Sequence, residues 1–206
     1  MCGIIGYAGP RNAERVVIDG LRRMEYRGYD SAGIAVVDAG QIHLRKKAGK
    51  LINLETELEI SPLPESHLAI GHTRWATHGA PNDPNAHPHV SANGRVALVH
   101  NGIIENFAGL KAELVAEGVQ FTSDTDSEVA AQLLGRLVEG GADLADAMRE
   151  VCNLLEGAFT LVAIETAEPN RLVAARRNSP LVVGVGEGEM FVASDVAAFI
   201  EFTKQA

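Results

Sequence analysis

The chain has 206 residues, of which 27 are acidic and 18 basic, so its formal net charge is −9. That length, with a hydrophobic content of 46%, predicts one globular domain over residues 1–206. The acidic balance argues against a nucleic-acid or anionic-membrane partner, because no basic block is present to neutralise phosphates. No apolar run approaches the roughly 18 residues that a membrane-spanning helix needs, and the N-terminus lacks a signal-peptide pattern. We therefore expect a cytoplasmic protein.

The chain begins with an apolar run, residues 2–8, that predicts a buried strand. Its first residue, Cys2, is small enough for the initiator methionine to be removed, and it would then carry a thiol and a free α-amine. Such an amine has a pKa of about 7.7–8.0, so it can accept the thiol proton near neutral pH. Position alone does not separate this nucleophile–base pair from a small residue that merely opens a strand. The other cysteine, Cys152, lies on a predicted helix and is expected to be an inert core thiol.

Apolar periodicity in the next part of the chain predicts a helix followed by antiparallel strands. The helix covers residues 12–24, and the strands cover residues 31–37, 41–47 and 67–72, the first two joined as a hairpin. Residues 51–64 are only weakly patterned. Residues 73–93 form a polar loop that is longer than most loops in compact domains, and such loops are commonly functional.

The second half of the chain begins with a strand over residues 95–101 and continues into helices over residues 106–117, 125–137 and 143–155. The second of these helices opens on a capping-box pattern, Thr125-Asp126-Ser127-Glu128. Strand-like runs follow near residues 158–165, 171–176, 181–186 and 190–194, and a last helix is predicted over residues 195–202. Because strands neighbour strands and helices neighbour helices, we expect an α+β fold with mainly antiparallel sheets.

Three polar positions beside these elements supply groups that an amide-hydrolysing site needs. Arg74 follows a predicted strand, where an arginine is more often a surface ion-pair partner. Asn101-Gly102 ends another strand with an amide and with a backbone N–H that can be approached closely, although the pair could equally form a turn. Asp126 lies in the first turn of a helix, where an acid often only complements the helix dipole.

Together with Cys2, these residues predict thiol-dependent hydrolysis of the side-chain amide of a free amino acid. Cys2 supplies the nucleophile and its own amine the base. The tetrahedral oxyanion needs preplaced donors, which the Asn101 side chain and the Gly102 N–H provide. A bidentate guanidinium such as Arg74 suits an α-carboxylate, and a carboxylate such as Asp126 suits an α-ammonium.

The segment His87-Pro88-His89 does not favour a metal site. The intervening proline prevents both rings from sharing a helical face, and no acidic or thiol ligand lies at metal spacing nearby. We expect neither a metal nor a cofactor.

At this point a family resemblance becomes visible over essentially the whole chain. It rests on the motifs M-C-G-I-I-G, E-Y-R-G-Y-D-S-A-G, H-T-R-W-A-T-H-G, N-A-H-P-H, H-N-G-I-I-E-N and S-D-T-D-S-E. In this order they resemble the glutaminase domain of the glutamine–fructose-6-phosphate aminotransferases, which belong to the class II, N-terminal-nucleophile glutamine amidotransferases. Other members of that class share the leading cysteine and the Asn-Gly pair, but W-A-T-H-G and H-N-G-I-I-E-N favour the sugar enzymes.

The resemblance implies a four-layer αββα sandwich of two mainly antiparallel sheets, the N-terminal-nucleophile hydrolase fold. It implies Cys2 as nucleophile and Asn101 with Gly102 as oxyanion hole. It also implies further roles: Arg74, Thr77 and His78 at the glutamine carboxylate, Asp126 with Gly102 at the α-amine, Trp75 as an ammonia gate, His87 on a closing loop, and Arg27 with Asp30 supporting the N-terminus.

The resemblance further implies a longer protein, because the family continues into a sugar-phosphate isomerase region that has no counterpart here. We therefore expect a C-terminally truncated glutaminase domain whose ammonia serves glucosamine 6-phosphate synthesis in a full-length, homodimeric, cytoplasmic enzyme of amino sugar biosynthesis. The alternatives are the glutaminase domain of another class II amidotransferase, an N-terminal-nucleophile amidase with a different substrate, and a non-catalytic module that senses glutamine through Arg74 and Asp126.

Overall fold

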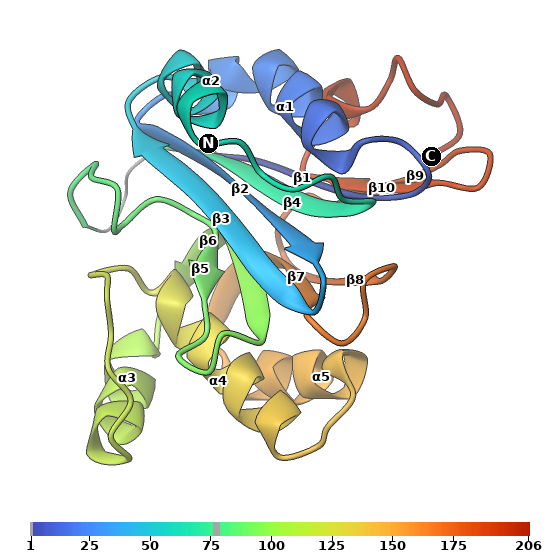
Figure 1. Cartoon of the computed structure of the whole chain (residues 1–206). Coiled ribbons are helices and arrows are strands. Elements are labelled where there is room, and N and C mark those ends of the chain that lie inside the picture. Colours follow the sequence, from blue (N-terminus) through green and yellow to red (C-terminus); the bar gives the residue numbers. More distant parts are fainter. Residues whose placement is uncertain (1, 76–78) are drawn as a thin grey trace.

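The computed structural model describes residues 2–75 and 79–206. Two antiparallel sheets face each other, and helices cover the outer face of each sheet (Figure 1). The larger sheet has the strand order β3-β2-β4-β1-β10-β9, and the smaller one has the order β5-β6-β7-β8. Helices α1 and α2 lie outside the larger sheet, whereas α4 and α5 lie outside the smaller one (Figure 1). This confirms the predicted αββα sandwich.

The elements agree in outline with the sequence patterns. The strands are β1 (Gly3–Ala8), β2 (Ser31–Asp38), β3 (Gln41–Ala48), β4 (Leu68–Arg74), β5 (His89–Val90), β6 (Val96–Ile104), β7 (Gly157–Glu165), β8 (Leu172–Arg177), β9 (Val182–Val185) and β10 (Met190–Ala193). The helices are α1 (Ala13–Arg23), α2 (Leu51–Ile60), α3 (Phe107–Ala116), α4 (Ser127–Glu139) and α5 (Leu144–Leu154), with short 3₁₀ turns η1 (Glu25–Arg27) and η2 (Val196–Ala198).

The layer between the two sheets is apolar along most of its length and polar at one end. Leu68 and Ile70 of β4 meet Ala97 and Val99 of β6 in this buried layer. Alternate residues of a strand point to the same face, so the next positions facing the layer are His72 on β4 and Asn101 on β6. Their side chains touch across the interface, with His72 Nε2 2.9 Å from Asn101 Oδ1. The alternation that places apolar side chains between the sheets therefore also places the polar side chains of His72 and Asn101 at the end of that layer.

Strand β1 fixes the position of the chain's N-terminal thiol. It runs between β4 and β10, with Gly3 opposite Thr73 and Ile5 opposite Ala193. Ile4 and Ile5 are fully buried, one in the layer between the sheets and the other against the helices. Cys2, the residue before this strand, therefore stands at the polar end of the layer between the sheets.

One helix was not predicted, and two element predictions were wrong. The weakly patterned segment 51–64 contains α2, whose Leu51, Leu54 and Leu58 are buried while Ile52 and Ile60 are exposed; those exposed apolar residues obscure the helical period. The predicted last helix is only the η2 turn, because the chain folds back and stacks Phe202 on Phe191 at 5.5 Å.

The second wrong prediction is the end of the strand at Asn101. Strand β6 continues through the Asn-Gly pair to Ile104, and Asn101 lies opposite Thr160 of β7. The pair is therefore part of a strand and not a turn.

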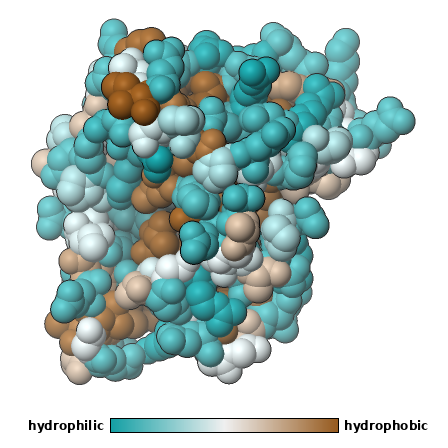
Figure 2. Space-filling view, in the orientation of Figure 1, coloured by the Kyte–Doolittle hydropathy of each residue, from teal (hydrophilic) through white to brown (hydrophobic). Residues whose placement is uncertain are grey.

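The molecular surface seen in Figure 2 is mainly hydrophilic, with hydrophobic residues gathered over α2 and α3. The exposed large apolar residues of these helices include Ile52 and Ile60 on α2 and Val115 on α3. Within the described residues, no helix is long and apolar enough to cross a membrane.

Candidate active site

The Cys2 thiol is held against the end of β4. The backbone N–H of Trp75 donates to Cys2 Sγ over 3.1 Å, and Sγ lies 3.5 Å from the Trp75 carbonyl oxygen. Burial raises the pKa of this thiol above its ordinary value. A thiol in this environment is mostly protonated near neutral pH, so it needs a base before it can act as a nucleophile.

The Asn101 amide is fixed at both of its ends. Its Nδ2 donates to the Cys2 carbonyl oxygen over 3.0 Å, and its Oδ1 lies 2.9 Å from His72 Nε2. The next residue, Gly102, has a φ of 129° and lies opposite Phe159. A Cβ at this position would be 2.0 Å from the Ala158 carbonyl oxygen, so only glycine allows β6 to approach β7 this closely.

Arg74 is the last residue of β4 and is only 4% exposed. Its guanidinium donates to the carbonyl oxygens of Gly79 and Ala80 over 3.2 and 3.3 Å. Burial lowers its pKa, but an arginine stays charged in proteins. A buried positive charge therefore faces the cavity beside Cys2.

The predicted capping box is wrong, because the Thr125 hydroxyl contacts Ser123 and His89, and the Glu128 carboxylate accepts from Thr122 and Ser123. The N-cap residue of α4 is Asp126. Its side chain makes no cap hydrogen bond; instead Oδ2 accepts from the Ile104 backbone N–H over 2.9 Å, and Oδ1 accepts from the Ser127 hydroxyl over 3.2 Å. Glu128 likewise accepts from the backbone N–H groups of Thr122 and Ser123. Asp126 is 5% exposed, so these bonds hold a buried carboxylate in place.

These residues meet around one small cavity, of about 20 Å³, which has room for about one water molecule. Its lining includes Cys2, Arg74, Gly102 and Asp126. The structure thus brings together four of the five residues singled out by chemical reasoning, and the fifth, Asn101, contacts Cys2 directly. A thiol, a cation and a carboxylate within one cavity suit a zwitterionic substrate that carries an electrophilic carbon.

The residues that the resemblance alone suggested occupy different places. Trp75 is 45% exposed and packs edge-to-face on Tyr29 at 5.3 Å. It lines the small cavity and also a second one of about 250 Å³, and Cys2 likewise lines both, whereas Arg27 lines only the second. Arg27 forms an ion pair with Asp195 at 2.6 Å, and the Asp30 backbone N–H donates to the Arg74 carbonyl oxygen over 3.0 Å. Thr77 and His78 lie outside the described residues.

His87 belongs to a buried cluster of imidazoles that sequence reasoning missed. Its ring stacks on His72 at 4.2 Å and contacts His89 at 4.7 Å, and its Nδ1 accepts from the His100 backbone N–H over 3.2 Å. Burial lowers the pKa of His72 to about 3 and that of His87 and His89 well below the ordinary value. These rings are therefore neutral. Among the described residues, no group of His, Cys, Asp and Glu could hold a metal ion.

The loop that carries His87 is anchored from the edge of the larger sheet. Lys46 of β3 donates to the carbonyl oxygens of Pro84 and Ala86 over 3.0 and 2.9 Å, and burial lowers its pKa to about 8. A Cβ at Gly33 would be 2.1 Å from the His87 carbonyl oxygen, so this glycine lets the loop lie on β2. Gly33 is the last residue of the E-Y-R-G-Y-D-S-A-G motif, and this glycine was the signal in the sequence for the contact.

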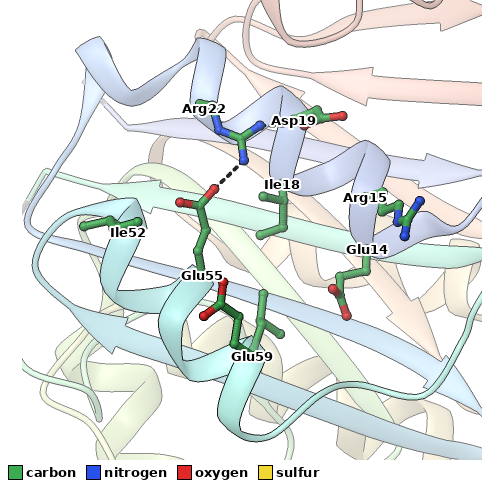
Figure 3. Close-up of a pocket in the computed structure, with 9 residues that line it drawn as sticks. Glu14, Arg15, Ile18, Asp19, Arg22, Ile52, Glu55 and Glu59 are labelled. Carbon is green, nitrogen blue, oxygen red and sulfur yellow. Dashed lines mark hydrogen bonds and ion pairs between the residues drawn. The ribbon is translucent and has the colours of Figure 1, made fainter.

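A third and larger cavity lies away from Cys2, in the groove between α1 and α2, with a volume of about 500 Å³. Figure 3 shows Arg22 and Glu55 reaching across this groove, 2.5 Å apart. Its described lining contains carboxylates and guanidiniums but no thiol or imidazole. It therefore offers no nucleophile or base of the kind that surrounds Cys2.

Solved structures with this architecture are known. The chain superposes with a TM-score of 0.83 on glutamine phosphoribosylpyrophosphate amidotransferase from B. subtilis, at 29% identity, over 97% of this chain and 43% of that one. A structure described as the allosteric regulatory enzyme of purine biosynthesis matches equally well, with a TM-score of 0.83 at 30% identity, over 97% of this chain and 43% of that one.

Curated proteins match at higher identity. Glutamine–fructose-6-phosphate aminotransferase (isomerizing) of Streptomyces coelicolor is 62% identical over all of this chain, which spans 34% of that protein. The enzymes of the same name from Corynebacterium diphtheriae and Mycobacterium tuberculosis are 60% and 56% identical, over the same shares. The chain thus spans about a third of the length of these relatives.

A family model described as a glutamine amidotransferase domain matches residues 72–201, which is more than half of the chain. The match includes Arg74, Asn101, Gly102 and Asp126, and Cys2 stands outside it but within the same cavity. The chain therefore belongs to the glutamine amidotransferase domain family.

Proposed function

We propose that the protein hydrolyses L-glutamine to glutamate and ammonia through a γ-glutamyl thioester on Cys2. The observation that carries this proposal is the meeting of one thiol, Cys2, with the amide of Asn101, the backbone of Gly102 and two buried, opposite charges at one cavity. A non-catalytic glutamine sensor needs the charges but has no use for a thiol beside oxyanion donors.

The reaction follows from these groups in four steps. In a chain from which Met1 has been removed, the α-amine of Cys2 takes the thiol proton, and the sulfur attacks the side-chain amide carbon of glutamine. The oxyanion accepts hydrogen bonds from Asn101 Nδ2 and the Gly102 N–H. The protonated amine then donates its proton to the leaving nitrogen, and ammonia departs. Finally the amine activates a water that cleaves the thioester and releases glutamate.

Arg74 and Asp126 would bind the two charged ends of the amino acid. The Arg74 guanidinium now donates to neutral carbonyl oxygens over 3.2–3.3 Å, and a substrate carboxylate would form shorter, charge-assisted bonds in their place. The small cavity, of about 20 Å³, has room for about one water molecule, and we expect its walls to move apart when glutamine enters. We assign Thr77 and His78 to the carboxylate as well, and His87 to the loop that closes over the substrate.

The ammonia is best used where water cannot protonate it. Trp75 lines both the small cavity and the 250 Å³ cavity, and we assign it the role of a gate between them, with Arg27 and Asp30 supporting the N-terminus. The curated relatives are named for fructose 6-phosphate and are about three times as long. We infer that in a longer, homodimeric, cytoplasmic protein an isomerase region uses this ammonia to make glucosamine 6-phosphate.

The proposal is tested with 6-diazo-5-oxo-norleucine, a reactive glutamine analogue, followed by peptide mass spectrometry. We expect one adduct, on Cys2, and a parallel loss of ammonia release from glutamine. The half-buried Cys152 thiol, whose pKa is also raised by burial, serves as the internal control and should stay unlabelled. Binding of glutamine without ammonia release or an adduct would support the sensor, and release of ammonia from other amides but not from glutamine would support a different amidase.

A further inference from the structure

His72 links the two sheets beside the nucleophile. It lies on β4 between Ile4 of β1 and Gly33 of β2, and it is 1% exposed. Its Nε2 contacts two oxygen atoms of β6 in the other sheet, the His100 carbonyl oxygen at 3.0 Å and Asn101 Oδ1 at 2.9 Å. His72 opens the H-T-R-W-A-T-H-G motif, but no role was predicted for it, because its contact joins residues from different sheets.

The contact with His100 determines where the imidazole carries its hydrogen. A backbone carbonyl oxygen can only accept a hydrogen bond, so Nε2 must be the protonated nitrogen of His72. The ring is neutral, because burial lowers its pKa to about 3. The opposite nitrogen, Nδ1, is buried and has no hydrogen-bond partner among the described residues, as expected for a ring whose only hydrogen is on Nε2.

A protonated Nε2 in turn determines how the Asn101 amide is rotated. The amide atom 2.9 Å from Nε2 must be the acceptor, Oδ1, which leaves the NH₂ group directed toward Cys2. At that end the Cys2 carbonyl oxygen, another pure acceptor, takes a hydrogen bond from Nδ2 over 3.0 Å. All these hydrogen bonds therefore run in one direction. His72 donates to the His100 carbonyl oxygen and to Asn101 Oδ1, and Asn101 Nδ2 donates to the Cys2 carbonyl oxygen.

The His72 ring is also held in its plane. It stacks on His87 with an interplanar angle of 22°, and His87 is itself fixed by the backbone N–H of His100. Were the Asn101 amide to rotate by half a turn, its oxygen would face the site where negative charge develops, and the oxyanion would lose a donor and gain a repulsive contact.

We propose that His72 is a positioning residue for glutamine hydrolysis: its Nε2–H fixes the rotation of the Asn101 amide so that the NH₂ group faces the oxyanion formed at Cys2. This inference rests on the proposed glutaminase function. It assigns to His72, which lines the small cavity beside Cys2, a role that is exerted through the Asn101 amide. Through that amide His72 acts on the transition state, because the oxyanion is absent from bound glutamine.

Two variants of similar polarity separate the hydrogen bond from the fold. In His72→Gln the side-chain amide nitrogen can occupy the position of Nε2, whereas in His72→Asn the side chain is too short to reach Asn101. We expect His72→Asn to lower kcat by about 10- to 100-fold with KM within about twofold, which stays inside the range for complete loss of an oxyanion donor. His72→Gln should retain kcat within about fivefold, since it restores the donor.

The same substitution in an Asn101→Ala background tests whether His72 acts through Asn101. There His72→Asn should change kcat by less than about threefold, because the amide that it positions is gone. An equal loss of kcat in both backgrounds, or a His72→Asn enzyme with wild-type kcat, would overturn the proposal. Thermal unfolding of each variant shows whether a loss of rate reflects loss of fold.

A measurement on the unsubstituted protein tests the tautomer of the His72 imidazole independently of activity. Long-range ¹H–¹⁵N correlation spectra distinguish the two neutral imidazole tautomers from the imidazolium. We expect the Nε2–H tautomer for His72 from pH 5 to pH 8; an Nδ1–H tautomer or an imidazolium would refute the proposal even if the variants fail to fold. If the unsubstituted protein releases no ammonia from glutamine, the proposed function fails while this spectrum still reports on the His72–Asn101 contact.

Discussion

The cavity at Cys2 and the groove between α1 and α2 are both lined by charged side chains, yet they differ in how those charges are held. Arg74 and Asp126 at the first are 4% and 5% exposed, and backbone groups fix each of them. Arg22 and Asp19 at the second expose 56% and 47% of their side chains and are held mainly by each other and by Glu55. The larger volume belongs to the groove, about 500 Å³.

The comparison indicates that the charged residues of an active site are identified by their burial and by their hydrogen bonds to the backbone. The volume of the cavity does not identify them. Charges out of water interact more strongly because the local dielectric constant is lower. Exposed ion pairs such as those of the groove contribute about 0–1 kcal/mol, since water and salt screen them. Substitutions at the Cys2 cavity should therefore change glutamine hydrolysis far more than substitutions in the groove between α1 and α2.

The largest effect is expected from the chain end at Cys2. If Met1 is retained, the α-amine becomes an amide nitrogen that cannot accept the thiol proton, and burial already raises the pKa of that thiol. Loss of the base should lower the glutaminase rate by about 10²–10⁴-fold. The measurement compares two preparations of verified intact mass, one treated with methionine aminopeptidase and one with Met1 intact. Equal rates would mean that the amine is not the base.

Asn101→Ala should lower kcat by about 10²–10³-fold while leaving KM nearly unchanged, because the oxyanion exists only in the transition state. Steady-state ammonia release gives both constants. Asn93→Ala is a suitable control, because this asparagine is on the same side of the sandwich but bonds to Gly135 and Glu139, away from Cys2. Near wild-type turnover in Asn101→Ala would remove it from the oxyanion hole.

Arg74→Lys should raise KM for glutamine by about tenfold or more with a smaller change in kcat, since lysine keeps the charge but loses the two-pronged geometry worth about 1.5–3 kcal/mol. Lysine also reaches the carbonyl oxygens of Gly79 and Ala80 with fewer donors. An unchanged KM would exclude Arg74 from the carboxylate site.

The buried imidazoles should make the Cys2 side of the molecule sensitive to acid. The pKa of His72 is about 3 in the folded state, below the unfolded value of about 6.5. The unfolded state therefore binds the extra proton, and stability that is full above pH 6.5 is lost as the pH falls toward 3. His72→Gln should reduce the slope of unfolding free energy between pH 6 and pH 4 by up to about 1.4 kcal/mol per pH unit, measured by urea unfolding. An unchanged slope would mean that His72 is charged in the folded protein.

The smallest effect is expected in the groove. Arg22→Ala removes the ion pairs to Asp19 and Glu55, and it should change the free energy of unfolding by less than about 1 kcal/mol. We expect kcat and KM for glutamine to stay within experimental error. A tenfold change in either constant would show that the groove communicates with Cys2 and would contradict the distinction between the two regions.

Several features of the fold and of the site could be predicted from the amino-acid sequence alone. Alternating and helical apolar patterns predicted the strand before which Cys2 stands, the hairpin of β2 and β3, and the antiparallel α+β class, because these depend on residues close together in the chain. Residue chemistry also selected Cys2, Arg74, Asn101, Gly102 and Asp126, which the structure brings to one place.

The contacts that position those residues could not be predicted from the sequence, because they join segments that are far apart in the chain. Helix α2 was hidden because its exposed Ile52 and Ile60 look like core residues in the sequence. Asn101-Gly102 has the local pattern of a turn, and pairing with β7 keeps it in a strand. The His72–Asn101 bond depends on how two sheets are placed face to face, and local periodicity records which face a residue takes but not which distant residue it meets there.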